Sequence, residues 1–152
     1  MIERVTFGGV EFAIIIRGDF NKPGIHFFTP GDFSQQLGYM RHPIGHVIEP
    51  HIHNAVHRSV HFTREVLFLR RGRLRVDFYT EGGDYLESRE LEGGDVILLA
   101  AGGHGFEVLE EIEMIEVKQG PYIGDADKTR IKDIPSSKII SSGPCKSTTP
   151  KS

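Results

Sequence analysis

Short runs of apolar and β-branched residues recur between glycine and proline residues throughout residues 3–120, and this pattern constrains the fold more than any other feature. Examples are Phe12-Ala13-Ile14-Ile15-Ile16 and Val96-Ile97-Leu98-Leu99. Runs of this length, bounded by turn residues, are typical of β-strands. No stretch shows a sustained helical period with capping residues. The sequence therefore predicts an all-β fold.

The expected strands are short and follow one another closely. They cover residues 5–7, 11–17, 24–28, 36–42, 45–49, 65–70, 73–80, 85–92, 95–99, 105–109 and 113–118, with turns at 31–32, 71–72, 81–84 and 93–94. Many short strands favour a barrel or a sandwich, because closing a sheet removes its exposed edges. We predict a single jelly-roll β-barrel.

A chain of 152 residues is long enough for one domain with its own core. We assign the barrel to residues 1–122 and a C-terminal extension to residues 123–152. The extension is rich in Ser, Lys and Pro, which cannot bury a core, so we predict a loose tail from about Ser136. The single cysteine, Cys145, lies in this tail and excludes an internal disulfide.

Charge and hydropathy exclude several partners. The formal net charge is -3 and the basic residues are scattered, so we expect no nucleic acid partner. The longest apolar run has the length of a strand, far short of the ~20 residues that cross a bilayer, so we expect no membrane partner. The start of the chain lacks the pattern of a signal peptide, and we expect a cytoplasmic protein.

The strongest candidate for chemistry is a set of histidines with one glutamate. In an extended strand, His51 and His53 point to the same face while Ile52 faces away. With one cysteine in the chain, a metal must take nitrogen and oxygen ligands. We predict that His51, His53, Glu65 and His104 bind it. The plainer interpretation is a solvated polar loop, because six of the eight histidines fall between His42 and His61.

These residues stand at spacings that resemble the motifs of the cupin family. Gly45, five residues, His51-Ile52-His53, then Glu65, six residues and Gly72 resemble the first motif, with a longer segment before Glu65. Gly94, five residues, Ala100-Ala101-Gly102-Gly103 and His104 resemble the second, with Ala100 in place of the usual proline. The resemblance implies a jelly-roll barrel with its motif region at 45–104 and one divalent transition metal, with Fe, Mn, Ni, Co and Zn not distinguished.

One alternative for the fourth ligand stays open. His57 or His61, inside the longer segment, could replace or supplement Glu65. We favour Glu65, because residues 63–69 alternate like a strand that enters a core and place Glu65 on the face of Leu67 and Leu69.

Further residues are candidates for the walls of the pocket. Phe106 shares a face with His104 in an extended strand, and Tyr39, Arg41 and Arg64 could recognise a substrate carboxylate or hydroxyl. Glu116 and Lys118 are candidates for acid and base catalysis if they point inward. The alternative, an exterior pair facing water, is the commoner arrangement for charged side chains.

The expected function is therefore a metal-dependent cupin that acts on or binds a small oxygen-rich metabolite, such as a sugar derivative or a hydroxy or keto acid. The enzyme classes that fit are a metal-dependent isomerase or epimerase and an Fe(II)-dependent dioxygenase, and the alternative is a binding or sensor protein without turnover. We also expect a homodimer, because apolar residues occupy both faces of strands such as 65–70.

Overall fold

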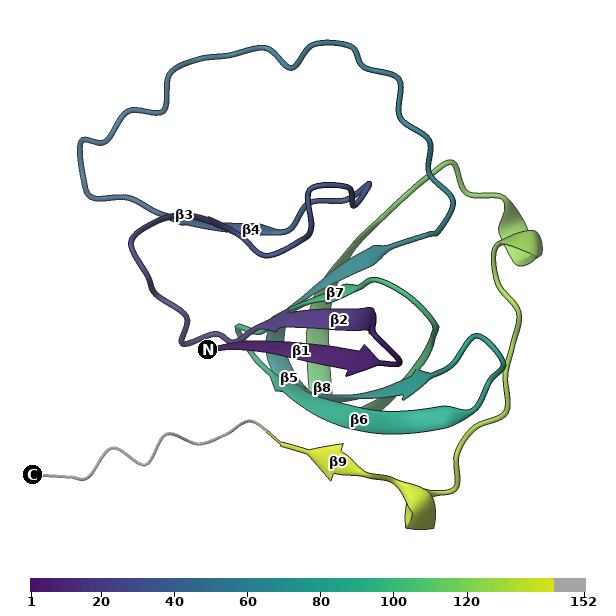
Figure 1. Ribbon diagram of the computed structural model, residues 1–152. Coiled ribbons are helices and arrows are strands. Elements are labelled where there is room, and N and C mark those ends of the chain that lie inside the picture. The colour runs from purple at the N-terminus through teal and green to yellow at the C-terminus, as the bar shows by residue number, and fades with distance from the viewer. Residues whose placement is uncertain (144–152) are drawn as a thin grey trace, which may run out of the picture.

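The computed structural model describes residues 1–143, leaving aside the side chain of Asp125, and the fold is all-β (Figure 1). The strands are β1 (Ile2–Phe7), β2 (Val10–Ile16), β3 (Gly24–Phe27), β4 (Gly38–Arg41), β5 (Glu65–Tyr79), β6 (Tyr85–Glu92), β7 (Val96–Leu99), β8 (Gly103–Lys118) and β9 (Ser141–Ser142). Two single-turn 3-10 helices, η1 (Gly124–Asp127) and η2 (Ser136–Lys138), lie in the C-terminal extension. The prediction of an all-β fold is confirmed.

One curled sheet makes up most of the molecule. Its strand order is β1-β2-β7-β5-β6-β9, with β8 paired to β5, and a separate two-stranded sheet is formed by β3 and β4. The first residues of β5 pair with β7, its last residues pair with β6, and β8 follows β5 almost from end to end. The long β5–β8 ladder therefore bends the sheet into half a barrel (Figure 1).

One predicted turn and one gap between two predicted strands are strand in the structure. Residues 65–79 form one strand where the sequence predicted two strands and a turn at 71–72, and the predicted strands 105–109 and 113–118 belong to the single strand β8. The ladder changes register around Arg71 and Arg73, as it does at β-bulges. Gly72 has a φ of 86°, and a Cβ there would lie 2.1 Å from the carbonyl oxygen of Glu111. The glycine therefore bends a continuous strand.

The predicted strand at 45–49 is also wrong, because residues 42–64 form no helix or strand. Pro43 and Pro50 lack the N–H that a ladder needs, and Gly45 has a φ of 85°. Most of this segment is exposed, and Figure 1 shows it arching away from the curled sheet between β4 and β5. His51 and His53 therefore lie in a loop and not in a strand.

Two apolar clusters lie on opposite faces of β2 and β7. The larger fills the concave side of the sheet with side chains that include Ile15, Leu67 and Phe78. The smaller, around Ile14 and Leu98, is covered by the segment that holds β3 and β4. Burial on both faces explains why residues 12–16 are continuously apolar.

The C-terminal extension still contacts the sheet beyond Ser136, where the sequence predicts a loose tail. Ser88 donates its backbone N–H to the carbonyl of Ile140 at 2.8 Å, and β9 pairs in parallel with β6. The hydroxyl of Tyr85 lies 2.9 Å from the backbone N of Ile140. Contacts with the sheet thus reach Ser142, and residues 144–152 of the predicted loose tail, including Cys145, lie outside the described residues.

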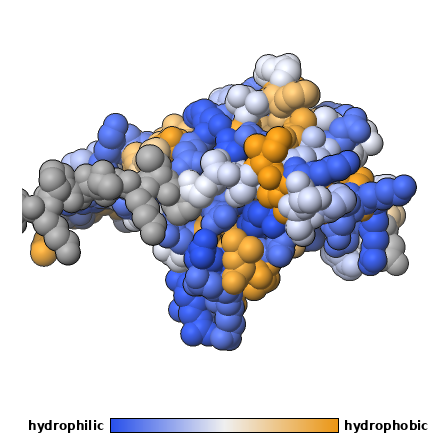
Figure 2. All heavy atoms as spheres, turned by 90° about the horizontal axis from the view of Figure 1, so that it is seen from below, coloured by the Kyte–Doolittle hydropathy of each residue, from blue (hydrophilic) through white to orange (hydrophobic). Residues whose placement is uncertain are grey.

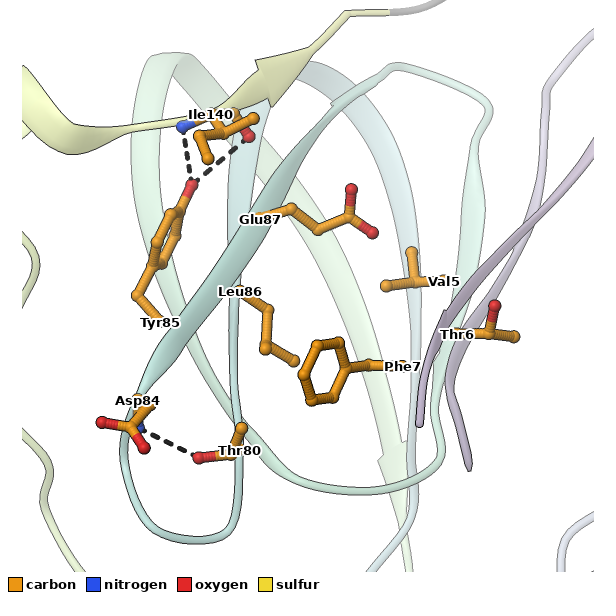
Figure 3. A pocket seen from close by; sticks show the side chains of 9 residues that line it. All are labelled: Val5, Thr6, Phe7, Thr80, Asp84, Tyr85, Leu86, Glu87 and Ile140. Atoms are coloured by element: carbon orange, nitrogen blue, oxygen red, sulfur yellow. Dashed lines mark hydrogen bonds between the residues drawn. The ribbon is translucent and has the colours of Figure 1, made fainter. Parts of the chain in front are cut away.

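The half-barrel has an open side between β1 and β6. A cavity of about 660 Å³ lies there, with apolar walls that include Val5, Phe7 and Leu86 (Figure 3). Exposed apolar side chains interrupt the hydrophilic surface of the molecule (Figure 2). Within residues 1–143, no helix is long and apolar enough to cross a membrane.

Candidate metal centre

The centre of the candidate site is a contact between Glu65 and His104. The Oε2 atom of Glu65 lies 3.1 Å from the Nε2 atom of His104, and both side chains are partly buried. In the β5–β8 ladder, Glu65 is opposite Lys118 at one end, and His104 is opposite Phe78 at the other. The two side chains meet because the ladder curls.

Strand alternation explains why both side chains point to the concave side. Leu67 and Leu69 belong to the inner cluster, and Glu65 stands two residues before Leu67 on the same face. Phe78 belongs to the same cluster, and its ladder partner His104 shares its face. The predicted place of Glu65 on the face of Leu67 and Leu69 agrees with the structure.

The electrostatics of the site keep Glu65 ionised. The hydrogen bond with His104 lowers the pKa of the Glu65 carboxyl, while partial burial opposes this shift. The positive charges of Lys118 and Lys128 lower the same pKa further. An ionised carboxylate only accepts, so Nε2 of His104 carries a proton in this contact and must lose it before Nε2 and the carboxylate oxygen can bind a cation together.

The other two predicted ligands lie together in the exposed loop. The ring centroids of His51 and His53 are 5.1 Å apart, and the rings are nearly perpendicular. His51 Nδ1 lies 2.9 Å from the backbone carbonyl of Glu49, so Nδ1 must carry the proton because a carbonyl only accepts. In the neutral ring, Nε2 of His51 then keeps its lone pair, the arrangement that metal-binding histidines commonly have.

The structure does not bring the two pairs together. Among the described residues, no three His, Cys, Asp or Glu side chains lie close enough to hold a metal ion. His57 and His61 also lie in the exposed loop and do not complete a group with Glu65 and His104. The donor types fit a transition metal, whereas the loop and the sheet are apart in this conformation.

Glu116 and Lys118 lie on the concave face. Directly opposite residues of an antiparallel pair point to the same side, and Glu116 is opposite Leu67 while Lys118 is opposite Glu65. The Nζ atom of Lys118 is 3.7 Å from Oε1 of Glu116. Both side chains are partly exposed at the rim. The pair therefore stands on the concave face, as the first interpretation from the sequence has it, and faces water, as the second has it.

Phe106 lies beside His104, with 5.3 Å between their ring centroids. It stands opposite Val76, a member of the inner cluster, and is 43% exposed, so its ring forms an open wall next to the histidine. The sequence predicted that Phe106 shares a face with His104, and their positions in the structure agree with this.

The remaining predicted substrate contacts are engaged elsewhere. Tyr39 packs edge-on against Phe20, and Arg41 donates to the backbone carbonyl of Asn21. The guanidinium of Arg64 lies 3.9 Å from the ring centre of Phe33 and donates to the hydroxyl of Ser34. These contacts tie the β3–β4 segment together and hold it at the start of β5, where Arg64 precedes Glu65.

Sequence reasoning missed Lys128. This residue follows η1 in the C-terminal extension, and its charge acts on Glu65. No motif marks it, because its relation to the site arises only when the extension folds back on the sheet.

Comparisons of the chain with family models, curated proteins and solved structures find no match.

Proposed function

We propose that the chain is a metal-binding cupin with a jelly-roll barrel, in which His51, His53, Glu65 and His104 hold one divalent transition metal. The observation that carries this proposal is the Glu65–His104 contact, which unites one predicted ligand from each motif at 3.1 Å. The proposed substrate or ligand is a small oxygen-rich metabolite, such as a sugar derivative or a hydroxy or keto acid.

The chemistry of the donors supports the proposal. Three imidazoles and one carboxylate suit Fe, Mn, Ni, Co or Zn, and Glu65 is already ionised. The loop at 42–64 has neither helix nor strand and is mostly exposed, so moving it breaks few buried contacts. Metal binding by the full set requires this loop to close over the concave face.

The residues around the centre have separate roles in this proposal. A bound divalent ion would polarise an oxygen atom of the small molecule. Glu116, on the same face as Glu65, takes and returns a proton, and Lys118 orients it through their 3.7 Å ion pair. Phe106 shields one side of His104 from water. An isomerase or epimerase fits these roles, and a dioxygenase requires iron at the same ligands.

A binding or sensor protein without turnover is the second candidate. It is favoured by the exposure of Glu116 and Lys118, whose side chains are 43% and 34% exposed. Solvent exchange of protons at such groups would compete with transfer to a bound molecule.

The experiment is elemental analysis of untagged protein for the wild type and for His51→Ala, His53→Ala and His104→Ala. We expect about one metal per chain in the wild type and a loss in each variant. His26→Ala is the matched control, because His26 lies on β3 and bonds the carbonyl of Pro23. Metal retained by all three ligand variants would refute the site.

Solvent deuterium entering a recovered sugar or acid tests the isomerase. Oxygen uptake by protein loaded with Fe(II) tests the dioxygenase. A ligand that raises the melting temperature without either reaction supports the binder.

We also propose a homodimer. Phe68 and its ladder partner Ile115 lie on the convex side of the sheet, beside Val117. Their side chains are 39%, 49% and 56% exposed, and a second copy would cover them.

A further inference from the structure

The gap between β1 and β6 is bridged at one end and open at the other. At the bridged end, Nε of Arg89 on β6 lies 3.8 Å from Oε2 of Glu3 on β1. Arg17, which pairs with Glu3 at 2.7 Å, also donates to the backbone carbonyl of Glu90 at 2.8 Å. At the open end, where β1 reaches Phe7, lies the cavity of about 660 Å³. These polar contacts therefore hold the two walls of the cavity at its inner end.

The C-terminal extension keeps β6 from pairing with β1. The edge of β6 that faces away from β5 pairs with β9, and Ser88 on this edge donates its backbone N–H to the carbonyl of Ile140 at 2.8 Å. The hydroxyl of Tyr85 accepts from the backbone N–H of Ile140 at 2.9 Å. These bonds hold Ile140, which is 66% exposed, as a third wall of the cavity.

The cavity has an apolar floor and an apolar mouth. Val5 belongs to the inner cluster and Leu86 packs against it, so the floor is continuous with the core. Phe7 at the mouth is 55% exposed, and its ring lies beside the Leu86 side chain (Figure 3). Concave apolar sites of about 300–1,000 Å³ are typical of pockets that bind small molecules. An apolar molecule here would remove these side chains from water.

The charged residues that line the cavity are both acids, Asp84 and Glu87. One carboxylate oxygen of Glu87 accepts from Arg89 at 2.6 Å, and among the described residues its other oxygen has no hydrogen-bond partner. Figure 3 shows the Glu87 side chain directed from β6 across the cavity towards Val5. A carboxylate oxygen in this position can accept a charge-assisted hydrogen bond from an ammonium group, and it repels an anion.

We propose that this cavity binds a small apolar molecule that carries an ammonium group, such as an aromatic amine. The apolar part lies on Val5, Phe7 and Leu86, and the ammonium group bonds Glu87. The site is independent of the candidate metal centre, because none of the proposed metal ligands lines it.

Tryptamine is the probe. The chain contains no tryptophan, so the indole fluorescence of the probe can be excited apart from the tyrosines, and its anisotropy rises on binding to the protein. Tryptophol, with a hydroxyl in place of the amine, is the neutral probe, and indole-3-acetate is the anionic one. We expect the wild type to bind tryptamine about tenfold more tightly than tryptophol, and indole-3-acetate most weakly.

Two variants test the contacts. Glu87→Gln should remove the preference for tryptamine over tryptophol, and Phe7→Ala should weaken the binding of both probes about fivefold. Glu111→Gln and Phe27→Ala are the matched controls, because these side chains lie on β8 and β3, are 87% and 59% exposed, and do not line the cavity. Both controls should bind like the wild type.

Equal affinity of the wild type for tryptamine and tryptophol overturns the inference, as does a wild type that binds no probe. Tryptamine binding that is unchanged in Glu87→Gln also overturns it, because the amine would then bind elsewhere. Circular dichroism checks that each variant is folded. Glu87→Gln preserves the size of the side chain and decides the question even if Phe7→Ala does not fold.

Discussion

The carboxylate of Glu65 lies 3.1 Å from the imidazole of His104, although the two residues belong to opposite ends of the β5–β8 ladder. A flat ladder of this length would hold them far apart. Their contact is therefore a direct consequence of the curl of the sheet, and it places one donor from each predicted motif at the same point.

The Glu65–His104 contact should make stability depend on pH. The pKa of Glu65 is lowered from its ordinary value of 4.5, first by the hydrogen bond with His104. A lowered pKa in the folded state stabilises the protein above the unfolded value, and this contribution is lost as the pH falls through the folded value. Glu65→Gln should therefore lower the free energy of unfolding by about 1 kcal/mol at neutral pH.

Urea unfolding at pH 7 and at pH 3 measures this difference. Glu113→Gln is the control, since Glu113 is 48% exposed and paired with surface arginines. A Glu65→Gln effect of the same size at both pH values would contradict the prediction.

Metal should order the loop at 42–64. Hydrogen exchange of its amides should slow when Zn(II) or Mn(II) is added to the wild type, because the proposed ligands His51 and His53 would be drawn to the sheet. His104→Ala should abolish this protection, while the amides of β6 exchange equally in all samples. Equal protection of the loop in His104→Ala would show that His51 and His53 bind metal without the sheet.

The ion pair of Arg17 and Asp95 should be needed for folding stability. Asp95 is 1% exposed and accepts from Arg17 at 2.6 Å and from the backbone N–H of Gly18 at 2.9 Å. Asp95→Asn leaves the buried guanidinium without this carboxylate and should cost about 3 kcal/mol in denaturant unfolding. Asp19→Asn, at an exposed pair with the N-terminus, should change stability little. Equal effects of the two substitutions would contradict this account.

Gly72→Ala should destabilise the bend in β5. A Cβ at this position would meet the carbonyl oxygen of Glu111, and the φ of 86° disfavours any L side chain. We expect a loss of about 2 kcal/mol or more in the free energy of unfolding. Gly31→Ala is the control, because nothing lies within 4 Å of its added Cβ. A Gly72→Ala protein as stable as Gly31→Ala would show that β5 does not require glycine at its bend.

Ile115→Asp should dissociate the proposed dimer. The substitution puts a charge at the centre of the exposed patch that Ile115 forms with Phe68 and Val117. Light scattering should give twice the chain mass for the wild type and the mass of one chain for the variant. Ile44→Asp, in the exposed loop, should remain dimeric. A wild-type mass of one chain would exclude the dimer at that concentration.

Local sequence was sufficient for most strands. Alternation and turn residues predicted β6 at its observed bounds and β2 and β7 to within one residue. They failed at Gly72, because a glycine with positive φ serves a turn and a bulge equally well, and only the partner strand distinguishes them. They failed at 45–49 because a strand forms only where another edge pairs with it, and no strand edge within residues 1–143 meets this segment.

The sequence predicted the positions of some residues of the candidate site and not of others, again because local patterns do not show which strands pair. Glu65, His104 and Phe106 have side chains whose direction follows from strand alternation, so their common face could be read from the sequence. The inward direction of Glu116 and Lys118 required the ladder register with β5. The effect of the Lys128 charge on the pKa of Glu65 could not be predicted from the sequence, because it depends on how the extension packs.

The sequence by itself determined an all-β chain and which residues of one strand share a face, since both follow from a period of two residues. Only the tertiary structure decided that the sheet curls, that Glu65 and His104 therefore touch, and that the extension packs back on β6. These relations depend on contacts between residues far apart in the chain, which no local pattern encodes.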